Sequence, residues 1–125
     1  MGIKLRYKKP GFLKKANFKK WQDYHQWQRQ MNEKLQEIKL NYLQAVIILC
    51  IQWHHDIDPK ITQVQIANSL EIDPMLASLS IRTLEKNGWL IRKTHPKDTR
   101  AKSLHLTSKT HQHLKTIERL LNLQL

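Results

Sequence analysis

The side chains best suited to chemistry in this sequence are cationic ones, grouped in its C-terminal third. Residues 82–115 hold nine bases and only two acids, and one of these acids, Asp98, stands two positions before Arg100. A carboxylate this close can orient a guanidinium through a charge-assisted hydrogen bond. Clustered cations of this kind bind anionic groups such as phosphate, so the pattern indicates a polyanionic partner.

The charge balance of the whole chain agrees with such a partner. Its 125 residues carry 22 Lys and Arg against 10 Asp and Glu, a formal net charge of +12. Eight of these bases and no acid lie in residues 1–20, whereas residues 21–81 are mildly acidic. Two separate basic segments suit a nucleic acid, which offers a long track of phosphates.

Other kinds of chemistry have little support in the sequence. Without a Gly-rich phosphate loop or a nucleophile–base motif, we expect no enzyme activity and no cofactor. His54 and His55 would point about 100° apart on a helix, so we expect no metal site. The longest apolar run, residues 45–51, is far shorter than the roughly 20 residues of a membrane span. With the single cysteine Cys50 ruling out an internal disulfide, we expect a cytoplasmic protein that does not enter a membrane.

The first half of the chain predicts an arm and two helices. Residues 1–16 show no sustained period and are expected to form a basic N-terminal arm. Apolar residues at alternating spacings of three and four predict a helix over residues 17–38, whose seam faces either the core or a dimer partner. Asn41 can cap a second, strongly apolar helix that runs to about residue 54 and lies at the centre of the core.

Two short helices joined by a tight turn come next. Thr62 and Gln65 form a capping box that begins the first of them. Asp73 caps the second, with Pro74 in its first turn, and Gly88 can take the left-handed conformation that ends a helix. This is a helix-turn-helix pattern, in which the second helix can enter the major groove of DNA.

A β-hairpin is predicted directly after the second short helix. Alternating residues predict strands over residues 89–93 and 103–106, joined by the polar tip at residues 96–100. Thr107 then caps a last helix with an apolar stripe. The predicted fold class is therefore mainly α with a small β-hairpin wing: a winged helix-turn-helix domain over residues 17–125.

These motifs resemble the MarR family of bacterial transcription regulators over about residues 40–110. Residues 61–70 resemble the first helix of the family's helix-turn-helix, residues 78–88 its recognition helix, and residues 95–102 its wing. The resemblance implies a homodimer that binds double-stranded DNA and regulates transcription, most simply as a repressor. The alternative is an accessory or packaging protein that uses the same fold with little sequence preference.

The resemblance also implies roles for individual residues. In the resembled family the residue that matches Arg100 enters the minor groove, and Asp98 would hold that side chain in place. The residue types on the exposed face of the second short helix, rather than the resemblance, suggest its contacts: Met75 and Leu79 would touch thymine methyl groups, and Arg82 a guanine or a phosphate. A polar residue is common in the family at the position of Leu79, so a shifted helix face is the alternative there. The candidate DNA-binding residues are Gln63, Met75, Ser78, Leu79, Arg82, Arg92, Lys97, Asp98, Arg100 and Lys102.

Two departures from the family pattern affect these expectations. Thr110 stands where the family usually has Gly. Only residues 108–125 follow the predicted wing, enough for one helix where the family mostly has two. The family's effector pocket adjoins the dimerisation helices, so this departure argues against a small-molecule effector, although one is still possible. We expect the dimer to be held by residues 17–38 and 108–125.

Overall fold

The computed structural model describes residues 10–94, 97 and 100–123. Its elements, in chain order, are the 3-10 helix η1 (Gly11–Lys14), α2 (Ala16–Leu35), the 3-10 helix η2 (Gln36–Ile38), α3 (Tyr42–His55), α4 (Gln63–Leu70), α5 (Pro74–Lys86), β1 (Leu90–Thr94), β2 (Lys102–Leu106) and α6 (Ser108–Leu120). The predicted fold class, mainly α with one antiparallel hairpin, is confirmed. None of the helices among these residues combines the length and the hydropathy that a membrane span needs.

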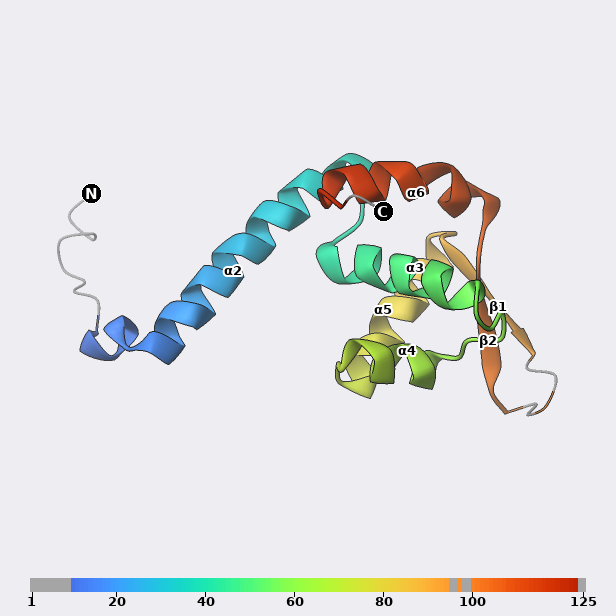
Figure 1. Cartoon of the computed structure of the whole chain (residues 1–125), viewed down its shortest axis with the longest axis horizontal. Helices are drawn as coiled ribbons and strands as arrows, with labels where there is room; N and C mark the ends of the chain where they lie inside the picture. Colours follow the sequence, from blue (N-terminus) through green and yellow to red (C-terminus); the bar gives the residue numbers. More distant parts are fainter. Residues whose placement is uncertain (1–9, 95–96, 98–99, 124–125) are drawn as a thin grey trace.

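Helix α3 lies at the centre of the structure, as its apolar sequence predicts. The Asn41 side chain accepts a hydrogen bond from the Gln44 amide, and the Gln44 side chain accepts one from the Asn41 amide, so both ends of a capping box are present. Figure 1 shows α3 between α6 on one side and α4 and α5 on the other. The residues that α3 buries completely are Ala45, Ile47, Ile48 and Ile51.

The predicted helix-turn-helix is formed by α4 and α5. Thr62 accepts a hydrogen bond from the Gln65 amide, and the Asp73 carboxylate accepts from the amides of Met75 and Leu76. The turn contains no Gly, and Glu71 takes the left-handed conformation there with φ of 53°. The tight turn therefore places α5 at a defined angle to α4 without the residue that usually permits such a turn.

The hairpin is fixed to the helix-turn-helix by its second strand. Strands β1 and β2 pair antiparallel from Leu90–Leu106 to Thr94–Lys102. The Leu104 amide donates to the Ile61 carbonyl at 2.8 Å, directly before α4 begins. Both strands differ from the prediction by one residue: β1 begins after Trp89 because the Trp89 carbonyl accepts hydrogen bonds from the start of α6 instead.

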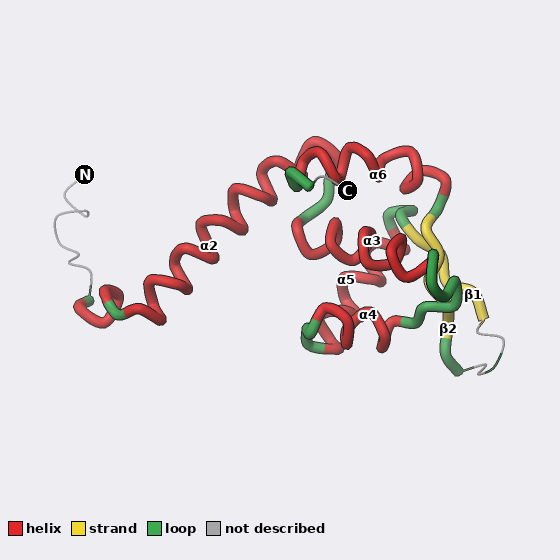
Figure 2. Tube along the Cα trace, in the orientation of Figure 1, coloured by secondary structure: helices red, strands yellow, loops and turns green. Residues whose placement is uncertain are grey.

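Helix α2 is anchored to the body only by its C-terminal half. Met31 and Leu35 are buried, and the ring of Trp27 packs edge-on against Tyr42 of α3 with their centroids 4.6 Å apart. The N-terminal half of α2 extends away from α3–α6 and the hairpin (Figure 2). The last three residues of the single helix predicted over residues 17–38 form the 3-10 helix η2 instead. Lys39 then takes a left-handed φ of 60° and turns the chain toward α3. In the segment predicted as an arm, η1 and the first residue of α2 are helical, and residues 1–9 lie outside the described residues.

Helix α6 closes the core on the side opposite α4. Its predicted apolar stripe packs against the core of the same chain, with Ile117 and Leu121 buried and Leu114 and Leu120 partly buried. Among the described helices, α2 carries the largest group of exposed aromatic side chains: Phe18, Trp21, Tyr24 and Trp27.

Candidate nucleic-acid interface

One face of helix α5 packs against the core, and the opposite face is exposed to solvent. Ala77, Ile81 and Leu84 are buried, as predicted from their spacing. On the opposite face, the exposed fractions of Met75 and Leu79 are 68% and 54%. These two residues are one helical turn apart, so they form a continuous apolar surface on the N-terminal half of α5.

The polar groups on the same side of α5 are partly engaged with each other. The Arg82 guanidinium donates from Nη2 to the Ser78 hydroxyl at 3.0 Å. Ser78 is half-buried and Arg82 is exposed. This bond holds the arginine along the helix, one turn beyond the apolar surface.

A cationic cleft lies where the hairpin meets the N-terminus of α4. It has a volume of about 310 Å³, and its lining contains three cations and no acid. Gln63, the first residue of α4, contributes the positive end of that helix dipole. The residues that line the cleft are Thr62, Gln63, Val64, Arg92, Arg100, Ala101 and Lys102.

Arg92 has a partner that the sequence did not reveal. Its side chain is 24% exposed, and its Nε lies 3.4 Å from Oε1 of Glu85 on α5. Glu85 was not among the candidate residues. The two residues are seven positions apart on a helix and a strand, so no local spacing rule relates them.

The tip of the wing is described only in part. Lys97, Arg100 and Lys102 are exposed, in keeping with their predicted role. Asp98 lies outside the described residues, so the predicted Asp98–Arg100 pair stays a prediction. What the structure adds is that Arg100 and Lys102 border the same cleft as Gln63.

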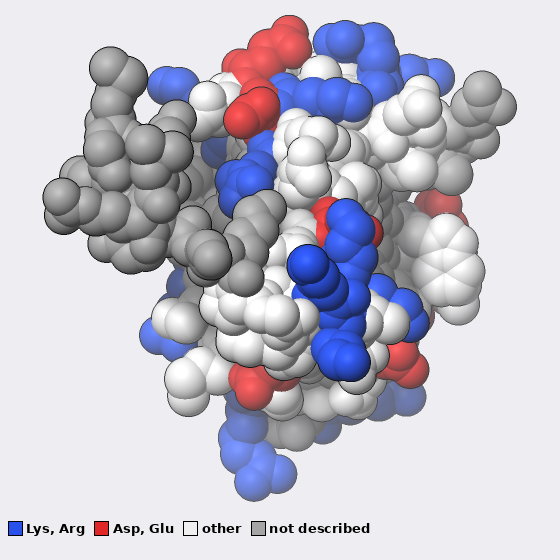
Figure 3. Space-filling model, turned by 90° about the vertical axis from the view of Figure 1, so that its left-hand side faces the viewer, with Lys and Arg blue, Asp and Glu red and all other residues white. Residues whose placement is uncertain are grey.

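The opposite end of the molecule carries mixed charge. Figure 3 looks at the end from which α2 projects, where groups of Lys and Arg alternate with uncharged and acidic side chains. Ion pairs on helices away from the hairpin include Lys19–Asp23 at 2.8 Å and Arg119–Glu37 at 3.9 Å. The cleft, whose lining contains cations but no acid, therefore differs in its charge composition from this surface, where both signs occur.

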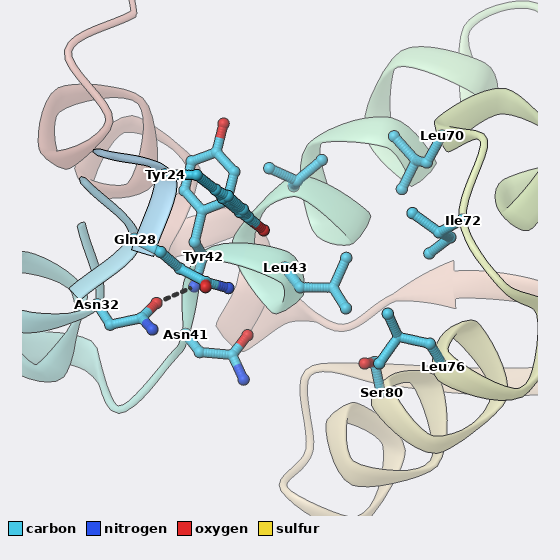
Figure 4. Close-up of a pocket in the computed structure, with 11 residues that line it drawn as sticks. Tyr24, Gln28, Asn32, Asn41, Tyr42, Leu43, Leu70, Ile72, Leu76 and Ser80 are labelled. Atoms are coloured by element: carbon cyan, nitrogen blue, oxygen red, sulfur yellow. Dashed lines mark hydrogen bonds between the residues drawn. The ribbon is translucent and has the colours of Figure 1, made fainter. Parts of the chain in front are cut away.

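A second hollow separates α2 from the helix-turn-helix. It has a volume of about 450 Å³ and is lined by uncharged side chains of α2, α3 and its N-cap, the end of α4, the turn before α5, and α5 itself. Figure 4 shows Tyr24, Gln28 and Asn32 on one side and Leu76 and Ser80 of α5 on the other. The lining of this hollow is uncharged although the chain carries a formal net charge of +12.

The other chemically reactive side chains do not gather into a site. Among the residues that the structure describes, no three His, Cys, Asp or Glu are grouped to hold a metal ion. His54 instead lies with Nε2 2.9 Å from the Ser69 hydroxyl. Burial raises the pKa of the Cys50 thiol above its ordinary value, which reduces the fraction of reactive thiolate.

Known proteins share both the motif and the fold. The family model described as MarR family matches residues 40–102. An uncharacterized HTH-type transcriptional regulator, YdcH of Bacillus subtilis strain 168, is 33% identical over 98 residues. That match covers 78% of this chain but 63% of YdcH, so the chain spans less than two thirds of that relative.

Solved structures agree with this assignment at the level of the fold. The Staphylococcus aureus MepR–DNA complex matches with a TM-score of 0.76 at 18% identity, covering 90% of this chain and 78% of MepR. The transcriptional repressor CouR, bound to a 23-mer DNA duplex, matches with a TM-score of 0.76 at 22% identity. The match covers 93% of this chain and 80% of CouR. With half of its length matched by the family model and the winged helix-turn-helix in place, the chain belongs to the MarR family.

Proposed function

We propose that this protein is a transcription regulator that binds specific sites on double-stranded DNA, most simply as a repressor, and we infer a cytoplasmic location from that role. The observation that carries the proposal is the cationic cleft between the hairpin and the N-terminus of α4, which is linked to α5 through the Arg92–Glu85 pair. A recognition helix in the major groove and cations on the flanking phosphates need this arrangement. MepR and CouR, which share the fold, were crystallised with DNA.

In this proposal α5 reads the bases. Met75 and Leu79 reach thymine methyl groups from the N-terminal half of the helix, which enters the groove most deeply. Ser78 and Arg82 lie beside them and are joined by a hydrogen bond, so Arg82 reaches either a guanine or a phosphate at the edge of the groove.

The hairpin and α4 hold the DNA backbone on either side. Gln63, Arg92, Lys97 and Lys102 bind phosphates, and the positive end of α4 favours an anion at Gln63. Arg100 enters the minor groove, oriented by Asp98, because a narrow minor groove attracts a guanidinium.

We propose further that the protein acts as a homodimer through α2. Four aromatic side chains on this helix remain more than two fifths exposed: Phe18, Trp21, Tyr24 and Trp27. Exposed aromatic surface on a projecting helix is costly in a monomer. A two-fold dimer would place two copies of α5 on successive turns of one DNA face.

The uncharged hollow favours a second role, the sensing of a neutral small molecule. Leu76 and Ser80 of α5 line it together with α2 residues. A ligand there would contact the dimer helix and the recognition helix at once. Such a ligand would therefore change the orientation in which α5 is presented to DNA.

A binding competition distinguishes the regulator from the low-specificity alternative. A duplex enriched from a random library is labelled, and fluorescence anisotropy measures its displacement by the unlabelled duplex and by random DNA. We expect the enriched duplex to bind at least about 1,000-fold more tightly. Equal competition by random DNA would support an accessory or packaging protein instead.

A further inference from the structure

The cationic cleft is joined to the recognition helix by one ion pair. Glu85 occupies the last turn of α5, and its Oε1 lies 3.4 Å from Nε of Arg92 on β1. Arg92 in turn lines the cleft together with Gln63. Three elements that must contact DNA together, namely α4, α5 and the hairpin, therefore meet at Arg92.

Arg92 occupies a position that is unfavourable for a cation on its own. Its side chain is only 24% exposed, and its buried Nε forms no hydrogen bond to the described residues. Arg100 and Lys102 line the same cleft and add like charge. Burial and repulsion would both drive the guanidinium out toward solvent, and the nearby carboxylate of Glu85 opposes both.

The contact with Glu85 uses only one edge of the guanidinium. Arginine has five N–H donors, and the pair with Glu85 involves Nε. The remaining donors suit the oxygens of a phosphate, which arginine binds in bidentate geometry. The positive end of α4 at Gln63 supplies further attraction for the same anion.

We propose that Glu85 is a positioning residue for DNA binding: it holds Arg92 in the cleft, where Arg92 and the N-terminus of α4 bind one backbone phosphate. The inference rests on the proposed function, because it assigns a DNA phosphate to this cleft. Since Glu85 belongs to α5 and Arg92 to the hairpin, the pair also fixes the recognition helix and the wing relative to each other.

The variant Glu85→Gln tests this role, because simple electrostatics and the positioning role predict opposite changes in the affinity for DNA. Removing an acid raises the net charge by one, which by itself tightens binding to DNA. We expect Glu85→Gln to weaken binding about tenfold, because Arg92 loses the carboxylate that offsets its burial and the like charge of Arg100 and Lys102. The matched control is Glu37→Gln, which removes the same charge from the Arg119 pair outside the cleft. The control should bind as tightly as the wild type, or slightly more tightly.

The salt dependence of binding separates positioning from a loss of folding. A lower folded fraction would reduce the affinity equally at every salt concentration. A lost phosphate contact instead reduces the slope of log K against log salt by about 0.9. We expect that smaller slope for Glu85→Gln, and we expect the double variant with Arg92→Gln to bind no more weakly than Arg92→Gln alone.

Three results would overturn the inference: Glu85→Gln binding as tightly as Glu37→Gln, an unchanged salt slope, or full additivity in the double variant. These are distinguishable from failure of the proposed function. If the proposed function itself were wrong, the wild-type protein would show no salt-dependent binding to duplex DNA.

Discussion

The hydroxyl of Thr110 donates a hydrogen bond to the backbone carbonyl of Trp89, which ties the first turn of α6 to the residue before β1. Thr110 is fully buried, and its hydroxyl also lies 3.1 Å from that of Thr107. Thr110 therefore joins α6 to the residue that precedes the hairpin.

We expect Thr110→Val to reduce the free energy of unfolding by about 1 kcal/mol, because it keeps the shape and removes the donor. Urea denaturation measures the change. Thr83→Val is the matched control, since the Thr83 hydroxyl donates to the Leu79 carbonyl on an exposed helix surface. An equal loss of unfolding free energy in both variants would mean that the buried Thr110–Trp89 hydrogen bond stabilises the fold no more than an exposed one.

The apolar pair on α5 predicts how the DNA sequence is read. Replacing thymine by deoxyuridine in the enriched duplex removes only the C5 methyl group and leaves base pairing intact. We expect a loss of about 1 kcal/mol at each contacted position, the scale of one buried methyl group. The variant Leu79→Ala should no longer distinguish the two duplexes at the position that Leu79 contacts. Equal binding of both duplexes by the wild-type protein would argue against methyl recognition.

The exposed aromatic face of α2 predicts the oligomeric state. Sedimentation at micromolar concentration should give a species of about twice the chain mass of 15.0 kDa. The double variant Phe18→Ser and Trp21→Ser should sediment as a monomer, because it removes two exposed aromatic side chains from the projecting half of α2 and leaves the Trp27–Tyr42 contact with α3 intact. Trp53→Ser is the control, since Trp53 is 62% exposed but lies on α3. A wild-type monomer would contradict the dimer.

Acid should destabilise the fold in part through His105. Its pKa is lowered by burial first, and then by the positive charges of Lys93 and His55. The unfolded chain therefore takes up the proton more readily. This contribution to stability is complete above the ordinary histidine pKa and is lost as the pH falls from there through the lowered pKa of the folded protein. We expect His105→Gln to lose less stability than the wild type between about pH 7 and pH 5. The exposed His111→Gln should follow the wild type, and identical pH profiles for all three proteins would refute the assignment.

The sequence predicted those elements whose signals are local. The caps at Asn41, Thr62 and Asp73 each act within three residues, and all three are present in the structure. Gly88 adopts the expected left-handed φ of 81°. Such signals need no knowledge of tertiary contacts, which is why the helix starts and the hairpin were predicted to within one residue.

Features that depend on contacts between elements were not predictable in this way. Glu71 takes a left-handed conformation because the adjacent Ile72 amide bonds to the Ala67 carbonyl and closes the end of α4. The Glu85–Arg92 pair and the uncharged hollow beside α2 each join residues from different elements. Periodicity indicates which face of a helix is apolar, but it does not identify the element that the face meets.

Hydroxyl-radical footprinting of the protein on its enriched duplex tests the central claim most directly. A winged-helix dimer predicts two protected segments related by two-fold symmetry, with centres about 10 base pairs or a multiple of that apart. Arg100→Ala should remove the minor-groove protection at the outer edges and leave the two centres in place. Continuous protection without a fixed register would contradict the account, because it would show that the protein coats DNA rather than reading it.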